Sequence, residues 1–82
     1  MTAHNIDQLI AMAALVANNP VEYTQLFHEL PEDTAIHIAQ HTGHVARIVK
    51  KDGTTYIITQ DYRTDRINLT ILDGIVTGVT IG

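Results

Sequence analysis

The chain has 82 residues and a mass of 9.1 kDa, with 45% hydrophobic and 17% charged residues, which excludes a large self-contained enzyme. Nine acidic against five basic residues give a net charge of -4, which would repel a phosphate backbone, so we expect no nucleic-acid binding. Cysteine is absent, which excludes disulfides and zinc–thiolate sites and is typical of a reducing compartment, so we expect a cytoplasmic protein.

The first half of the chain has helical spacing. Residues 6–17 carry apolar side chains at three- and four-residue steps, and Asn5 can cap the start of that helix. This stretch is too short and too polar to span a bilayer, and no Lys or Arg precedes it, so we expect neither a membrane partner nor a secretory signal. A second helix is predicted from Pro20, capped by Asn19, to an end at Pro31. Its apolar stripe consists of Tyr23, Leu26, Phe27 and Leu30.

Residues 32–41 predict a third helix. Acidic residues open the segment, where they suit a helix N-terminus, and Gly43 suits its end. A strand is the open alternative, because Ile36 and Ile38 stand two residues apart.

The second half, residues 43–82, is rich in Val, Ile, Thr and Tyr, which is typical of strands. Asp-Gly pairs at 52–53 and 73–74 predict tight hairpin turns, which need the positive φ that these residues tolerate. The strands are predicted at residues 45–50, 55–59, 67–71 and 75–81. We therefore expect a single α+β domain, with two or three helices in residues 1–42 and a four-stranded, mainly antiparallel sheet after them.

One segment of the second half has a distinctive order of residues. It reads Thr59-Gln60-Asp61-Tyr62-Arg63-Thr64-Asp65-Arg66-Ile67-Asn68-Leu69, followed by Gly74, Val76, Val79 and Gly82. In this order the chain resembles the potato inhibitor I family of serine-protease inhibitors and its small bacterial relatives. The resemblance covers residues 44–82 and implies the scaffold of that family for the β half.

The resemblance also implies a function. Members of that family present an exposed loop that enters a protease cleft like a substrate and is held rigid by arginines beneath it. The implied binding loop is Thr59, Gln60 and Asp61, with Gln60 before and Asp61 after the bond presented to a serine protease. Support for the loop is implied from Tyr62, Arg63, Asp65, Arg66 and Asn68, with Arg63 or Arg66 donating to Thr59 and Asp61 and with Gly82 joining them. Asn68 stands where plant members often have a second supporting arginine.

Two features depart from that family. A tight hairpin at 52–53 would place residues 55–59 in an antiparallel ladder and not in an exposed loop. The helical half is about twice as long as the single helix that the family requires. Since so small a core rarely contributes more than about 3–5 kcal/mol, we expect a homo-oligomer that forms through residues 6–30.

Other functions stay open. Arg63, Arg66, Arg47 and Lys51 could hold an anionic small molecule such as a signalling nucleotide, in a pocket between subunits. The helical half could instead dock on a larger host protein. Arg63 and Arg66 could also form a mere salt-bridged turn with Asp61 and Asp65.

Enzyme chemistry is not expected. Neither Ser nor Cys occurs, so the usual hydrolase nucleophiles are missing, and no glycine-rich phosphate loop is present. His37, His41 and His44 have spacings that one helix face could use to hold a metal, but no further ligands accompany them. We therefore expect no metal and no cofactor.

Overall fold

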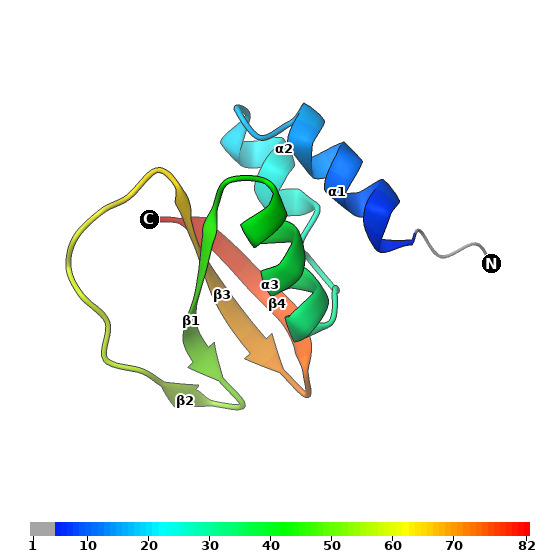
Figure 1. The fold of residues 1–82 in the computed structure, drawn as a ribbon. Helices are drawn as coiled ribbons and strands as arrows, with labels where there is room; N and C mark the ends of the chain where they lie inside the picture. The colour runs from blue at the N-terminus through cyan, green and yellow to red at the C-terminus, as the bar shows by residue number, and fades with distance from the viewer. Residues whose placement is uncertain (1–4) are drawn as a thin grey trace.

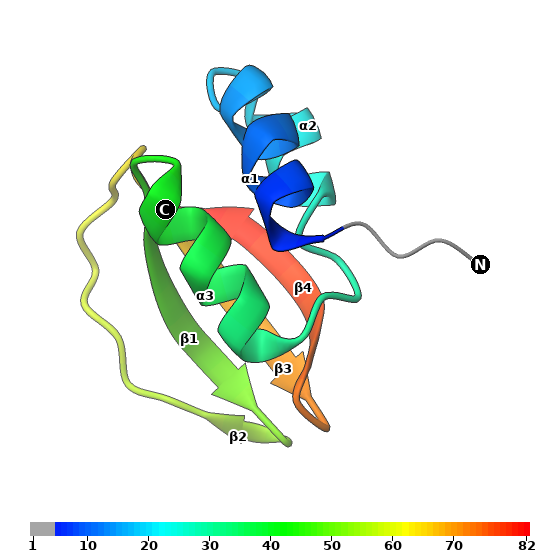
Figure 2. The same ribbon diagram turned by 45° about the vertical axis from the view of Figure 1, so that its right-hand side comes forward.

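A computed structural model describes residues 5–82 as three helices followed by a four-stranded mixed sheet, which confirms the predicted α+β arrangement (Figure 1). The elements are α1 (Ile6–Leu15), α2 (Pro20–Gln25), α3 (Glu32–His41), β1 (Val45–Lys51), β2 (Thr54–Thr55), β3 (Arg66–Leu72) and β4 (Ile75–Ile81). The helix α3 lies across one face of the sheet, whereas α2 packs against β4 and α1 against α3 (Figure 2). Of the helices in residues 5–82, none is long and apolar enough to cross a membrane.

The first two helices begin at the predicted caps. The Asn5 side chain accepts a hydrogen bond from Gln8 N at 2.8 Å, and the Asn19 side chain accepts one from Glu22 N at 3.2 Å. Since these bonds satisfy main-chain donors that have no partner within the helix, they explain why α1 and α2 start where they do.

The predicted end of the second helix is wrong. The helix α2 stops at Gln25, well before Pro31, and Glu29 adopts a φ of 68°. The reason is tertiary pairing: Glu29 N donates to Val76 O, and Val76 N donates to Leu30 O, both at 2.8 Å. These main-chain groups pair with β4 instead of continuing the helix.

The third helix is confirmed over the strand alternative. Its side chains at Ala35, Ile38 and Ala39 are buried against the sheet, at the three- and four-residue steps of a helix face. The chain leaves this helix through Gly43, whose φ is +79°.

The sheet has the order β2-β1-β3-β4, and its central pair is parallel. Val45 lies opposite Arg66, and Lys51 lies opposite Ile71, so β1 and β3 start at the same end of the sheet. Parallel neighbours need a crossover connection, because the chain must return to the starting end. Residues 56–65 make this return outside the β1 edge (Figures 1 and 2).

The predicted returning strand at 55–59 is wrong. The turn at 52–53 forms, with φ of 50° and 84°, but β2 contains only Thr54 and Thr55. The last main-chain bond to β1 runs from Tyr56 N to Val49 O at 3.0 Å. Beyond it the chain must leave the ladder to reach the start of β3, so the segment that follows is exposed.

Alternation along β3 separates two environments. Ile67, Leu69 and Ile71 are fully buried or nearly so and face the helices, as part of the hydrophobic core. Arg66 and Asn68 alternate with them and therefore belong to the opposite face. Residues of the helical half also contribute to the core. Its largest fully buried side chains are Tyr23, Phe27, Ile38, Ile67, Leu69, Ile71 and Val76.

Candidate functional site: a loop held by two arginines

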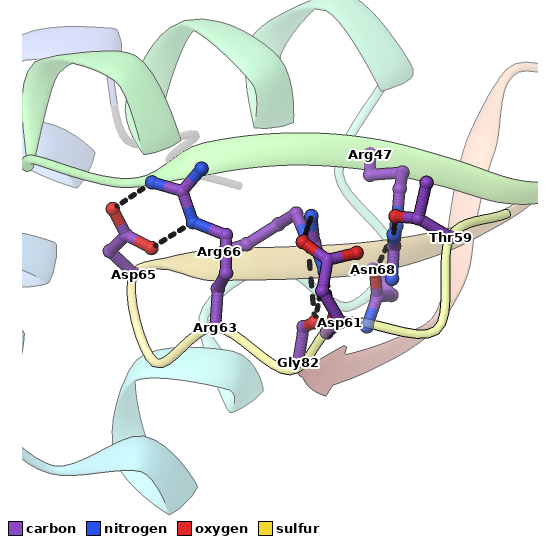
Figure 3. A network of polar contacts seen from close by, with 8 residues as sticks. All are labelled: Arg47, Thr59, Asp61, Arg63, Asp65, Arg66, Asn68 and Gly82. Atoms are coloured by element: carbon purple, nitrogen blue, oxygen red, sulfur yellow. Dashed lines mark hydrogen bonds and ion pairs between the residues drawn. The ribbon is translucent and has the colours of Figure 1, made fainter.

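The loop between β2 and β3 is the most exposed segment that the structure describes. Every residue from 56 to 64 is exposed, and Ile57 has a relative exposure of 102%. A segment with no buried side chain gains no order from the hydrophobic core. Its conformation therefore depends on polar contacts with the sheet, and these converge on residues 59–61 (Figure 3).

The first contact comes from Arg66, the opening residue of β3. Its side chain is 9% exposed and donates from Nε and Nη2 to the Gly82 main-chain oxygen, at 3.2 and 2.6 Å. The same Nη2 donates to the Asp61 main-chain oxygen at 2.5 Å, and Nη1 lies 3.5 Å from Asp61 Oδ2. One buried guanidinium thus ties the loop to the end of β4 (Figure 3).

The second contact comes from Arg47 on β1. Its Nη1 donates to Thr59 Oγ1 at 3.2 Å, and its Nε donates to Asn68 Oδ1 at 2.8 Å. Asn68 Nδ2 in turn donates to Thr80 Oγ1 on β4 at 3.4 Å. Thr59 is therefore bound by Arg47 from β1, and Asn68 from β3 holds that arginine in turn (Figure 3).

Arg47 is a loop-holding residue that the sequence did not reveal in that role. The resemblance implies Arg63 or Arg66 as the donor to Thr59, and the sequence offers Arg47 only as an anion-binding candidate. Its role follows from the parallel register, which places Arg47 directly opposite Asn68. No local sequence pattern fixes that pairing.

Arg63 does not hold the loop with its side chain. Its Nε and Nη2 donate to the two carboxylate oxygens of Asp65 at 2.9 and 2.8 Å, and both side chains are about half exposed. Hydrogen bonding within this pair raises the pKa of Arg63 and lowers the pKa of Asp65. The pair thus matches the salt-bridged turn, and Arg63 is tied to Gly82 only through its main-chain N at 3.3 Å.

Asp61 is exposed, and its pKa is lowered from the usual value. The Thr59 side chain, through a hydrogen bond, is the largest cause that lowers the Asp61 pKa, and the Arg66 charge lowers it further. The hydroxyl of Thr59 can donate to Asp61 while its oxygen accepts from Arg47, since one hydroxyl does both. The two residues that flank Gln60 are thus linked to each other as well as to the sheet.

Gln60 and Tyr62, the remaining candidates in the loop, are exposed. Tyr62 has a relative exposure of 70%, and its ring lies beside Gly82. Gln60 has no hydrogen-bond partner among residues 5–82. The structure therefore brings Thr59, Asp61 and Arg66 together, and leaves the Gln60 side chain free for a partner.

Of the four cations of the anion-binding alternative, Lys51 lies apart from Arg66. Lys51 lies 3.0 Å from Glu32 at the opposite end of the parallel pair from Arg66. Arg66 and Ile71, the residue opposite Lys51, are five steps of about 3.3 Å apart along β3. The remaining cations, Arg63, Arg66 and Arg47, each have the acceptors described above, so an anion would have to compete with them.

The three histidines are divided between two places. The rings of His37 and His41 stack with centroids 4.1 Å apart, whereas the His44 ring stacks on Tyr23 at 4.2 Å. Within residues 5–82, no group of three or more His, Asp or Glu side chains could hold a metal ion.

A second surface lies between α1 and α2. It is an apolar groove of about 390 Å³, lined by Met12, Leu15, Val16, Glu22, Gln25 and Leu26. Leu15 is 86% exposed, and Val21 nearby in α2 is 65% exposed. This is the segment for which an oligomer is predicted, and the mass of the protein in solution is the measurement that tests it.

Comparisons with protein-family models, with curated proteins and with solved structures give no match for the chain.

Proposed function

We propose that the protein is a small inhibitor-like binding protein that blocks a serine protease with the loop around Thr59–Asp61. The resemblance of residues 59–69 to the potato inhibitor I family gave this expectation. The observation that carries the proposal is the buried Arg66 side chain, which joins the Asp61 main-chain oxygen to the Gly82 oxygen beneath an exposed loop.

A loop that is ordered before it binds gains affinity. A flexible segment that enters a cleft loses conformational entropy, which costs about 1–2 kcal/mol for each residue whose backbone becomes fixed. A loop already held at Thr59 and Asp61 avoids much of that cost, so more of its contact energy contributes to affinity.

The same contacts oppose turnover of the loop as a substrate. If the bond between Gln60 and Asp61 were cut, Arg47 would still hold Thr59 and Arg66 would still hold Asp61. The two new ends would therefore stay close together, which favours resealing over release.

The test is inhibition of a panel of serine proteases by the full chain and by Asp61→Ala and Arg66→Ala. We expect stoichiometric inhibition of at least one enzyme and a loss of inhibition in both variants. Asp7→Ala, an exposed acid on α1, is the matched control and should inhibit like the parent. Asp61 is exposed, so Asp61→Ala folds even if Arg66→Ala does not. No inhibition across the panel, or full inhibition by Asp61→Ala, would overturn the proposal.

A further inference from the structure

Gln60 stands between the two residues that the arginines hold. Thr59 is bound by Arg47, and the Asp61 main chain is bound by Arg66. Within residues 5–82, neither arginine has a hydrogen bond to the Gln60 side chain. It is exposed and makes no hydrogen bond within residues 5–82.

The chemistry of this side chain restricts which class of protease pocket can bind it. Gln60 ends in an uncharged amide, which carries two N–H donors and an oxygen acceptor. A pocket with a carboxylate at its base, as in trypsin, selects a cation, and the apolar slot of chymotrypsin would bury the amide without a partner. Both pockets are therefore poor matches, because an unpaired buried polar group is penalised.

The residues before Gln60 add an apolar feature. Ile57 is fully exposed and Ile58 is 37% exposed, although both are large aliphatic side chains that would ordinarily be buried. Ile57 lies three positions and Ile58 two positions before Gln60, in the same exposed segment. A partner that covers the loop would bind more tightly if it buried these two side chains as well.

From these features, and resting on the proposed function, we infer that the partner is a protease that cleaves after glutamine. Its main specificity pocket pairs with the Gln60 amide, and an apolar subsite covers Ile57. Gln60 is thus the specificity-determining residue of the loop, whereas Arg47 and Arg66 position it.

The test compares three enzymes: trypsin, chymotrypsin, and a chymotrypsin-fold protease selected on peptides for cleavage after glutamine. The inhibitors are the parent chain, Gln60→Lys and Gln60→Leu. Gln40 is an exposed glutamine on α3, so Gln40→Lys and Gln40→Leu make the same chemical changes away from the loop. Inhibition constants are measured for each pair of enzyme and inhibitor.

We expect the parent to inhibit the glutamine-selective enzyme roughly 100-fold more strongly than the other two. Gln60→Leu should weaken that inhibition by roughly 100-fold and Gln60→Lys should gain inhibition of trypsin, with both Gln40 variants unchanged.

Two results would overturn the inference while leaving the proposed function standing. In the first, Gln60→Lys inhibits trypsin but the parent fails against the glutamine-selective enzyme. In the second, the parent inhibits trypsin or chymotrypsin equally well and the Gln60 variants change nothing. If no variant inhibits any enzyme, both the inference and the proposed function fail.

Discussion

The helix-covered face of the sheet and the loop at residues 56–65 are ordered by different forces. The covered face buries large apolar side chains such as Phe27 and Leu69, and its order comes from the exclusion of water. The loop buries none of its residues from 56 to 64 and depends on hydrogen bonds from Arg66 and Arg47. Because the forces differ, substitutions should be able to change the order of the loop and the stability of the whole domain separately.

The largest effect is expected from the core. Phe27→Ala removes a fully buried ring and should lower the free energy of unfolding by about 3–5 kcal/mol, measured by urea denaturation. Val21→Ala, at a position that is 65% exposed, is the control and should change it by about 0.5 kcal/mol or less. The folded fraction of Phe27→Ala should keep an ordered loop. A loosened loop in that fraction would show that the core and the loop are not independent.

Arg66→Ala should affect both regions. It removes the Arg66 donor from the Asp61 and Gly82 main-chain oxygens, of which Gly82 keeps the Arg63 main-chain N–H, so we expect a loss of about 2–3 kcal/mol in unfolding free energy. It should also make residues 57–63 mobile. Arg66→Lys keeps the charge but lacks the planar fork, so its effect should lie between those of the parent and the alanine variant. An ordered loop in Arg66→Ala would contradict the role given to this side chain.

Arg47→Ala should act more locally. It removes the donor to Thr59 and to Asn68, and we expect a loss of about 1 kcal/mol with increased mobility near Thr59. Lys50→Ala removes an exposed cation from the same strand and serves as the control. Denaturation measures the unfolding free energy of both variants, and backbone amide exchange measures the mobility near Thr59. Equal effects of the two variants would argue against a loop-holding role for Arg47.

A pH titration should loosen the loop without changing the sequence. The Asp61 pKa is lowered from its usual 3.8 by the Thr59 hydrogen bond first and by Arg66. A carboxyl whose pKa is lowered by folding stabilises the folded state fully above the usual value and loses that contribution as the pH falls through the lowered value. The Thr59 amide resonance should therefore shift below pH 3.8, and Asp61→Asn should abolish that transition. The same transition in Asp61→Asn would assign it to another group.

The smallest effect is expected from Arg63→Ala. Its partner Asp65 is about half exposed, and such exposed pairs contribute little because water and salt screen them. Unfolding midpoint and loop mobility should both match the parent. A loop that loosens as it does in Arg66→Ala would mean that Arg63 supports it after all.

The local features of the fold could be predicted from the sequence. The caps at Asn5 and Asn19 and the Asp-Gly turns at 52–53 and 73–74 depend on neighbouring residues alone, and all four form as predicted. The end of α2 could not be predicted, because it depends on main-chain pairing of Glu29 with a strand almost fifty residues away.

The support of the candidate site was harder to predict for the same reason. Residues 59–61 stood out as a candidate loop only through the resemblance, and the hairpin prediction opposed it. Alternating apolar residues indicate a strand but do not choose its partner, so the parallel pairing of β1 with β3 was hidden. That pairing both frees the loop and places Arg47 beneath it.

The most direct test of the account is the backbone mobility of residues 57–63, measured by NMR relaxation in the parent and in Arg66→Ala. If the arginines hold the loop, the parent should have order parameters near those of rigid backbone, about 0.85, and Arg66→Ala should fall below about 0.6. Values below about 0.6 in the parent itself would contradict the account, because a loop that is already mobile is not held by Arg66.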